Sequence, residues 1–246
     1  MDNLLKVTLI GLISGITGTS IGGLTAFFVR GVNKRFLSFI LEFAAGLMTS
    51  VVCFELIPEA FSYGGTVLTF AGVFAGVLTI MTVEEFLRRF GAIKQQNEKT
   101  GLLKAGILMA IGISLHNFPE GFAVGSSFGA SLSLGIMMTT VIIIHDIPEG
   151  IAMAVPMRAG GFSKSKAFFI TVLSGLPMGV GALLGAVLGG VSQGFIGACL
   201  GFAAGAMLYV VYGELVTESK RLYLGRLSSV GNVMGIICGI IVTLLN

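Results

Sequence analysis

The chain contains two copies of a short motif whose side chains are typical metal ligands. Residues 116–121 read HNFPEG, and residues 145–150 read HDIPEG, 29 positions further on. The two copies hold both histidines of the chain, and each copy lies inside a long apolar stretch. An ionisable side chain at the centre of a membrane helix costs about 3 kcal/mol or more, so its presence there indicates a functional site. Imidazole, amide and carboxylate groups that converge form the ligand set of a divalent metal ion.

Helical spacing places the polar side chains of each copy beside one pocket. In an α-helix, residues i and i+4 share one face, and the residue after i lies about 100° round the helix. The His and Glu of each motif therefore point the same way, and the Asn or Asp borders the same pocket. Two such helices joined by a short loop are antiparallel neighbours, so the motifs meet at a similar depth. The candidate ligands are His116, Asn117, Glu120, His145, Asp146 and Glu149.

This ligand set suits one or two cations. One ion can bind the His and Glu of both motifs, and a second can bind Asn117, Asp146 and the same two glutamates, which would bridge the ions. Mixed nitrogen and oxygen ligation suits zinc, iron or manganese better than calcium, and the absence of thiolates argues against a tight structural zinc site. The alternative is that the polar groups only join two membrane helices through hydrogen bonds. Two copies that both keep the carboxylate favour the metal site.

Each motif also contains a proline and a glycine. Pro119 and Pro148 cannot donate a backbone hydrogen bond to the carbonyl four residues earlier, so we expect each helix to kink there. Irregular backbone is tolerated inside a membrane only where it lines a cavity or is buried in protein. Gly121 and Gly150 lack side chains, and we expect them to widen the opening beside the pocket.

The composition indicates an integral membrane protein. Of the 246 residues, 54% are hydrophobic and only 11% are charged, whereas soluble domains carry about 25% charged residues. Eight apolar segments are long enough to cross about 30 Å of hydrocarbon. We therefore expect a single all-α transmembrane domain over residues 1–246. Its predicted spans are 5–29, 36–61, 66–88, 102–126, 131–155, 165–190, 194–218 and 228–246.

The positive charges predict the orientation in a cell membrane. Lys and Arg gather in the joints after the first, third, fifth and seventh spans, with Lys6 as the exception. By the positive-inside rule these joints are cytoplasmic, so we expect both termini on the outer side. The net charge of +3 is then an orientation signal and does not indicate a nucleic-acid partner.

The first three spans resemble the last three. Residues 42–48 (EFAAGLM) match residues 201–207 (GFAAGAM) at an offset of 159, which also aligns Glu55 with Glu214. The third and eighth spans echo each other through two glycine pairs, Gly72 and Gly76 with Gly235 and Gly239. Because each unit has three spans and two spans intervene, the second unit is inverted. An inverted repeat around a site in mid-membrane is typical of transporters, and we predict a 3+2+3 order with spans four and five at the centre.

Other polar residues have roles that the sequence leaves open. Met48 and its repeat mate Met207 are expected to pack in the core, although a thioether can be a soft ligand. Glu84 and Glu85 lie near Arg88 and Arg89, which is typical of a solvated helix end. Four further carboxylates either face water or form a vestibule or bridging ligand: Glu55, Glu59, Glu214 and Glu218.

The paired motifs within eight spans resemble those of the ZIP (Zrt/Irt-like) metal transporters, and the chain is most similar to the prokaryotic zinc-uptake and GufA-like branch. The resemblance covers essentially the whole chain. It implies a two-metal site between spans four and five that passes zinc, and also iron, manganese or cadmium, into the cytoplasm. It gives ligand roles to the six motif residues and adds Glu214 as a bridging carboxylate and Met48 as a contact at the first metal. Two positions depart from the family pattern: Gly213, where many relatives have His, and Thr217, where Pro is usual.

The resemblance further implies a homodimer, with divalent ions as substrates and no permanently bound cofactor. The competing hypothesis is a membrane-bound di-metal enzyme such as an oxidase. Di-iron bundles use Glu-x-x-His pairs, whereas this chain has His-x-x-x-Glu with a proline between, and it has no His-Glu-x-x-His protease motif. We therefore predict a transporter in the lipid bilayer that is not an enzyme.

Overall fold

The computed structural model describes residues 2–29, 33–89, 98–188 and 193–244. All regular structure in these ranges is helical, without a strand, which confirms the predicted all-α fold. Within the described residues, six helical stretches are long and apolar enough to cross a membrane: Asn3–Phe27, Lys34–Phe86, Lys99–Gly129, Leu132–Ala159, Lys164–Leu188 and Gly194–Leu222. A shorter apolar helix covers Arg226–Ile241.

The helices follow one another with short joints. In chain order they are α1 (Asp2–Gly23), η1 (Leu24–Phe27), α2 (Lys34–Val51), η2 (Val52–Leu56), α3 (Ile57–Arg89), α4 (Glu98–Ala130), α5 (Leu132–Ala159), α6 (Lys164–Ser174), α7 (Leu176–Leu188), α8 (Gln193–Val210), η3 (Val211–Leu215), α9 (Val216–Leu222) and α10 (Arg226–Leu244). η1 is a 3₁₀ turn, whereas η2 and η3 are π-helical.

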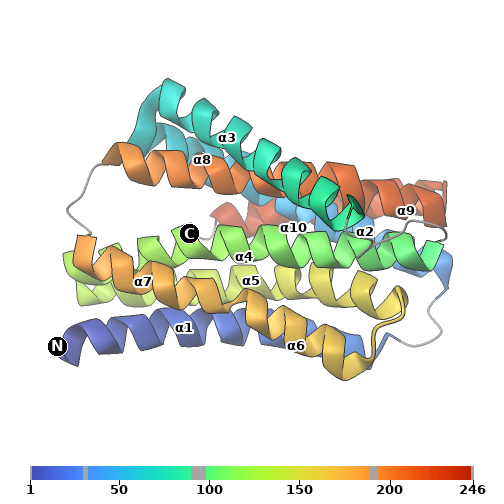
Figure 1. Cartoon of the computed structure of the whole chain (residues 1–246), viewed down its shortest axis with the longest axis horizontal. Coiled ribbons are helices and arrows are strands. Elements are labelled where there is room, and N and C mark those ends of the chain that lie inside the picture. Colours follow the sequence, from blue (N-terminus) through green and yellow to red (C-terminus); the bar gives the residue numbers. More distant parts are fainter. Residues whose placement is uncertain (1, 30–32, 90–97, 189–192, 245–246) are drawn as a thin grey trace.

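The long stretch from α2 through α3 turns back on itself. Its 53 apolar residues, Lys34–Phe86, are roughly twice the number that one membrane crossing needs. Gly65 lies inside α3 with φ 61° and ψ −178°, a conformation that glycine adopts readily because it has no Cβ. Figure 1 shows the chain reversing before the main part of α3. The stretch therefore consists of two helical arms.

The two π-helical turns occupy equivalent places in the sequence repeat. η2 begins at Val52 and η3 begins at Val211, 159 residues later, which is the offset found in the sequence. The fourth residue of η2 is Glu55, and the fourth residue of η3 is Glu214. A π-turn inside an α-helix is rare and is often found at a functional site. The same local irregularity thus recurs at both repeated glutamates.

The helices group into two bundles that lie side by side (Figure 1). The first bundle contains α1, α4, α5, α6 and α7, and the second contains α2, α3, α8, α9 and α10. The main link between them is the packing of α4 on α8. α4 and α5 therefore do not stand alone between two outer groups, because they share a bundle with α1, α6 and α7.

Glycines bring the helices of each bundle into close contact. A Cβ on Gly76 of α3 would collide with the α8 backbone at Phe202, and a Cβ on Gly235 of α10 would collide with the α2 backbone at Phe43. Both residues of the second pair of positions follow from the first by the offset of 159, since Gly235 corresponds to Gly76 and Phe202 to Phe43. The contacts favour this match over the predicted match of Gly76 with Gly239, which is one helical turn away.

Candidate metal site

The two motifs lie on neighbouring helices of the first bundle. α4 carries the first motif and α5 carries the second, and these helices pack against each other. Pro119 lies inside α4 and Pro148 inside α5, and neither proline ends its helix. Whatever bend each proline introduces, both motifs remain within continuous helices that fix the direction of their side chains.

His116 stands at the centre of the site. Its Nε2 atom lies 3.0 Å from Oε1 of Glu120 and 3.6 Å from Oε1 of Glu149. All three side chains are buried. The spacing of four residues explains the contact within α4, and the packing of α5 on α4 explains the contact between the helices. An imidazole nitrogen beside carboxylate oxygens from two helices is a donor set that suits zinc and related divalent ions.

The second motif contributes a further buried carboxylate. Asp146 is fully buried where α5 crosses α1, since a Cβ on Gly18 would collide with the Asp146 side chain. The side chain of His145 lies outside the described part of the structure, although its backbone belongs to α5. Among the side chains that are described, His, Cys, Asp and Glu do not form a closed group of three or more metal ligands. The described site therefore consists of pairwise approaches around His116.

Asn117 is held in place by an interruption in the neighbouring helix. Its Nδ2 atom donates a hydrogen bond of 2.9 Å to the carbonyl oxygen of Ser174, the last residue of α6. The N–H of Met178 donates to the carbonyl of Gly175 between α6 and α7, so the Ser174 carbonyl is available to Asn117. Asn117 is fully buried, and within the described residues its Oδ1 atom has no hydrogen-bond partner. The amide is thus fixed with an oxygen available to a cation.

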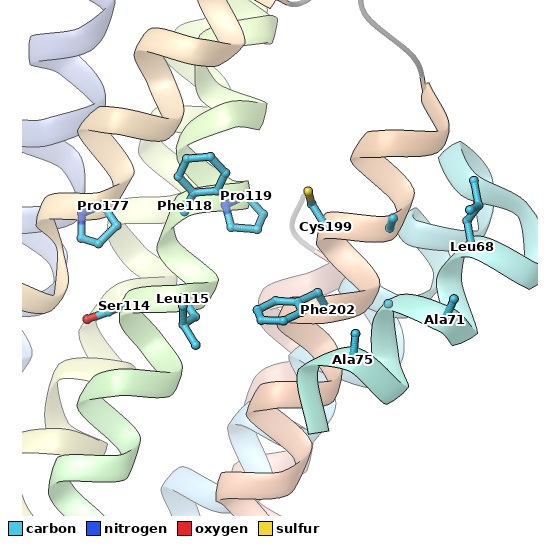
Figure 2. Close-up of a pocket in the computed structure, with 12 residues that line it drawn as sticks. Leu68, Ala71, Ala75, Ser114, Leu115, Phe118, Pro119, Pro177, Cys199 and Phe202 are labelled. Atoms are coloured by element: carbon cyan, nitrogen blue, oxygen red, sulfur yellow. The ribbon is translucent and has the colours of Figure 1, made fainter. Parts of the chain in front are cut away.

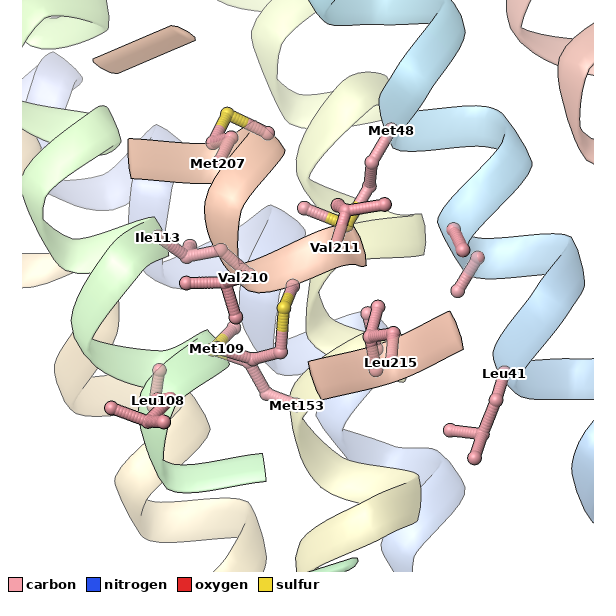
Figure 3. Packing of buried hydrophobic residues seen from close by; sticks show 14 of the residues in the cluster. Leu41, Met48, Leu108, Met109, Ile113, Met153, Met207, Val210, Val211 and Leu215 are labelled. Carbon is pink, nitrogen blue, oxygen red and sulfur yellow. The ribbon is translucent and has the colours of Figure 1, made fainter. Parts of the chain in front are cut away.

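Two residues that the resemblance adds to the site are engaged elsewhere. Glu214 is buried, and its Oε1 atom lies 2.7 Å from Nζ of Lys104. Met48 is buried in the apolar cluster that also contains Met153 and Met207 (Figure 3). The structure gives neither residue a contact with His116, Glu120 or Glu149. Both therefore remain predictions as metal ligands.

The other acidic residues divide between two sides of the site. Glu55 and Glu59 are half-buried, and Glu59 lies close enough to Glu55 and Glu120 for like-charge repulsion. Glu218 is buried and pairs with Arg221 at 2.6 Å. Glu55 and Glu59 thus continue the negative charge outward from the first motif, while Glu218 belongs to an ion pair.

Sequence reasoning missed a buried ion-pair cluster. Glu84 was expected at a solvated helix end, yet its Oε1 atom lies 2.6 Å from Nζ of Lys104 and its Oε2 atom accepts a hydrogen bond from Tyr209. Glu85 does pair with Arg89 at an exposed helix surface, as expected. The available signal was the position of Lys104, which lies two residues inside a predicted apolar span.

The glycines of both motifs serve packing and do not widen an opening. A Cβ on Gly121 would collide with the α7 backbone at Met178, and a Cβ on Gly150 would collide with the α1 backbone at Thr19. Met178 follows Thr19 by 159 residues, so the two contacts are equivalent in the repeat. The expected role of these glycines was wrong, because the neighbouring helices occupy the space that the missing side chains leave.

A large apolar cavity lies behind the first motif, between the two bundles. Its volume is about 650 Å³, and its walls come from α3, α4, α7 and α8 (Figure 2). Phe118 and Pro119 of the motif line it together with Cys199 and Phe202 of α8. The motif helix therefore has one polar face toward α5 and one apolar face toward this cavity.

Comparison with known proteins agrees with this site. A model of the family described as "ZIP Zinc transporter" matches residues 94–246, which include both motifs. The zinc transporter ZupT of Chlorobium limicola is 38% identical, over 96% of each chain. The proteins of the same name from Streptococcus mutans and Lysinibacillus sphaericus are 35% and 37% identical, over 88–89% of each chain. These relatives are named as transporters, which confirms the prediction that the chain is not an enzyme. The chain belongs to the ZIP family of zinc transporters.

Proposed function

We propose that this multi-pass membrane protein carries zinc, and related divalent cations such as iron, manganese or cadmium, through a site built on α4 and α5. The observation that carries the proposal is the approach of His116 to Glu120 and Glu149 inside long apolar helices. Buried ionisable groups at this depth are costly and mark ion pathways. The relatives named as zinc transporters support zinc as the main substrate.

The donor set suits a site that releases its ion. A transport site must bind well enough to admit a cation and weakly enough to let it leave. Carboxylates and imidazoles from two helices, without a thiolate, provide intermediate affinity in place of the closed cage of a structural zinc site. The cation is then the substrate, and no permanently bound cofactor is needed.

The site has room in its ligand set for two cations. We propose that His116, Glu120, Glu149 and His145 hold the first ion, with Met48 as an additional contact. Asn117 and Asp146 bind the second, and both motif glutamates bridge the ions. Glu214 acts as a further carboxylate on the path. Support comes from the burial of these residues and from the fixed Asn117 amide, whose oxygen is available to a cation.

The proposed architecture has eight spans in a 3+2+3 order with an inverted repeat. Equivalent π-turns, the equivalent crossings at Gly76 and Gly235, and the equivalent packing of both motif glycines support the repeat. Gly15 of α1 also packs against Gly175, its repeat mate at an offset of 160, as expected where a pseudo-twofold axis passes between them. The distribution of Lys and Arg supports outer termini, inward transport follows from the family resemblance, and we propose a homodimer on the same ground.

The proposal is tested by X-ray absorption at the zinc K-edge. The chain has only two histidines, one in each motif, so any imidazole signal from zinc-loaded protein purified without a polyhistidine tag reports the motifs. We expect imidazole scattering in the unchanged protein and its loss in the double variant His116→Ala with His145→Ala. An imidazole-free spectrum in unchanged, folded, zinc-loaded protein would contradict the proposed site.

A further inference from the structure

A buried ion-pair cluster joins the two bundles at one end. Lys104 of α4 lies with Nζ 2.6 Å from Oε1 of Glu84 in α3 and 2.7 Å from Oε1 of Glu214 in η3. Tyr209 of α8 donates a hydrogen bond of 2.8 Å to the other oxygen of Glu84. The side chains of Lys104, Glu84 and Glu214 are only 14%, 24% and 6% exposed. Since α4 belongs to the first bundle and the other elements to the second, Lys104 links the bundles directly.

The backbone of α4 also packs closely on the second bundle at this end. Gly101 lies three residues before Lys104, and a Cβ there would collide with the carboxylate of Glu218 in α9. Arg221 holds that carboxylate through an ion pair of 2.6 Å. The start of α4 therefore contacts two buried carboxylates of the second bundle, Glu214 and Glu218.

The other half of the same interface is apolar and hollow. The cavity of about 650 Å³ lies between α3 and α8 on one side and α4 and α7 on the other (Figure 2). No charged side chain lines it, and its walls include Leu68, Leu115 and Phe202. Apolar walls separated by a cavity lose their contacts with one another. Directional bonds between the bundles are thus concentrated at the Lys104 end.

The repeat shows that this arrangement is not a consequence of symmetry. Glu55 and Glu214 occupy equivalent π-turns 159 residues apart. Within the described residues Oε2 of Glu55 has no hydrogen-bond partner, whereas Glu214 is bound by Lys104. An ammonium group therefore neutralises one of the two repeated carboxylates, at one end of the molecule.

We propose that Lys104 is a positioning residue that locks the two bundles together at the end where α3 finishes and α4 begins. Ion pairs that are shielded from water are stronger than exposed ones, so the lock must break when this end opens. Under the proposed orientation this is the cytoplasmic end of the path. A cation that binds Oε1 of Glu214 must also displace the Lys104 ammonium. The inference rests on the proposed transport function, because only a transporter needs this end to open.

The test measures the distance between the bundles at this end. Lys99 of α4 and Lys220 of α9 are exposed, so both are replaced by spin-labelled cysteines after removal of the three native cysteines. Pulsed EPR on protein in nanodiscs then gives the distance distribution. With Lys104 present we expect one narrow population. In Lys104→Met, which keeps an apolar stem without the charge, we expect a second population longer by about 5 Å, on the order of one helical turn.

Two further variants make the result decisive. Lys104→Arg keeps a positive charge and is expected to keep the narrow distribution. Exchange of the charges, Lys104→Glu with Glu84→Lys, is expected to restore it, and it also serves if Lys104→Met does not fold. A folded Lys104→Met protein with an unchanged narrow distribution would overturn the lock, as would a charge exchange that behaves like Lys104→Met when that variant has opened. Zinc flux in the same proteins is a separate readout: absence of flux in unchanged protein counts against the transport function, while the distances still decide the lock.

Discussion

At the scale of single residues, the site uses neighbouring backbone to hold its ligands. The carbonyl of Ser174 fixes the Asn117 amide because the helix is interrupted at Gly175. The spacing of four residues along α4 fixes His116 beside Glu120. Positioning of this kind lowers the cost of arranging ligands around a cation, as the outer hydrogen bonds of metal sites generally do.

Replacement of Asn117 tests whether its oxygen binds a cation. Asn117→Leu keeps the approximate size of the side chain and removes both the oxygen and the hydrogen bond to Ser174. We expect zinc affinity at the weaker of two sites to fall by roughly 10- to 100-fold, measured by isothermal titration calorimetry. Ser126→Ala on the same helix removes a hydroxyl that bonds to Phe122, and it should leave the titration unchanged. An Asn117→Leu protein with two sites of normal affinity would show that the amide is structural.

At the scale of elements, the motif helices are fitted to their neighbours through small residues. Gly121 allows α4 to touch the α7 backbone at Met178, and Gly150 allows α5 to touch the α1 backbone at Thr19. In membranes, helix association depends on such close packing because lipid removes the hydrophobic driving force. The glycine of each motif therefore sets the position of the helix that carries the ligands.

Two glycines of α4 provide a matched pair for this claim. A Cβ on Gly121 would collide with the backbone at Met178, whereas a Cβ on Gly129 would meet nothing within 4 Å. We expect Gly121→Ala to destabilise the protein by about 1–3 kcal/mol, as overpacking does. Gly129→Ala should be neutral or stabilising, because alanine favours a helix. Unfolding followed by circular dichroism in detergent gives the comparison, and equal stability of the two variants would rule out the packing role.

The helices and the motif pair were predictable, since apolar runs and four-residue spacing are properties of the sequence alone. The grouping into bundles was not, because it depends on which glycine faces which backbone. The pairing of Gly76 with Gly235 shows this, since a glycine one turn away at Gly239 gave an equally plausible match. Glu84 was mistaken for a solvated residue because its partner Lys104 lies across a loop, 20 residues away.

At the scale of the whole molecule, the site belongs to one bundle and part of its surroundings to the other. The first bundle carries both motifs, while Glu59 and Glu214 come from the second. The interface between the bundles is hollow in one half and joined by ion pairs in the other. A cation that moves along the path therefore meets groups from both bundles, and a change in their relative position alters its surroundings.

The most direct test of the account is zinc influx into proteoliposomes that contain a zinc-sensitive dye. Glu120→Ala removes a carboxylate beside His116, and Glu85→Ala is the control because Glu85 pairs with Arg89 at an exposed surface. The account predicts saturable influx in unchanged protein, the same influx in Glu85→Ala, and a decrease of roughly tenfold or more in Glu120→Ala. Equal influx in all three proteins, or no influx of any divalent cation in folded protein that binds zinc, would contradict transport through the paired motifs.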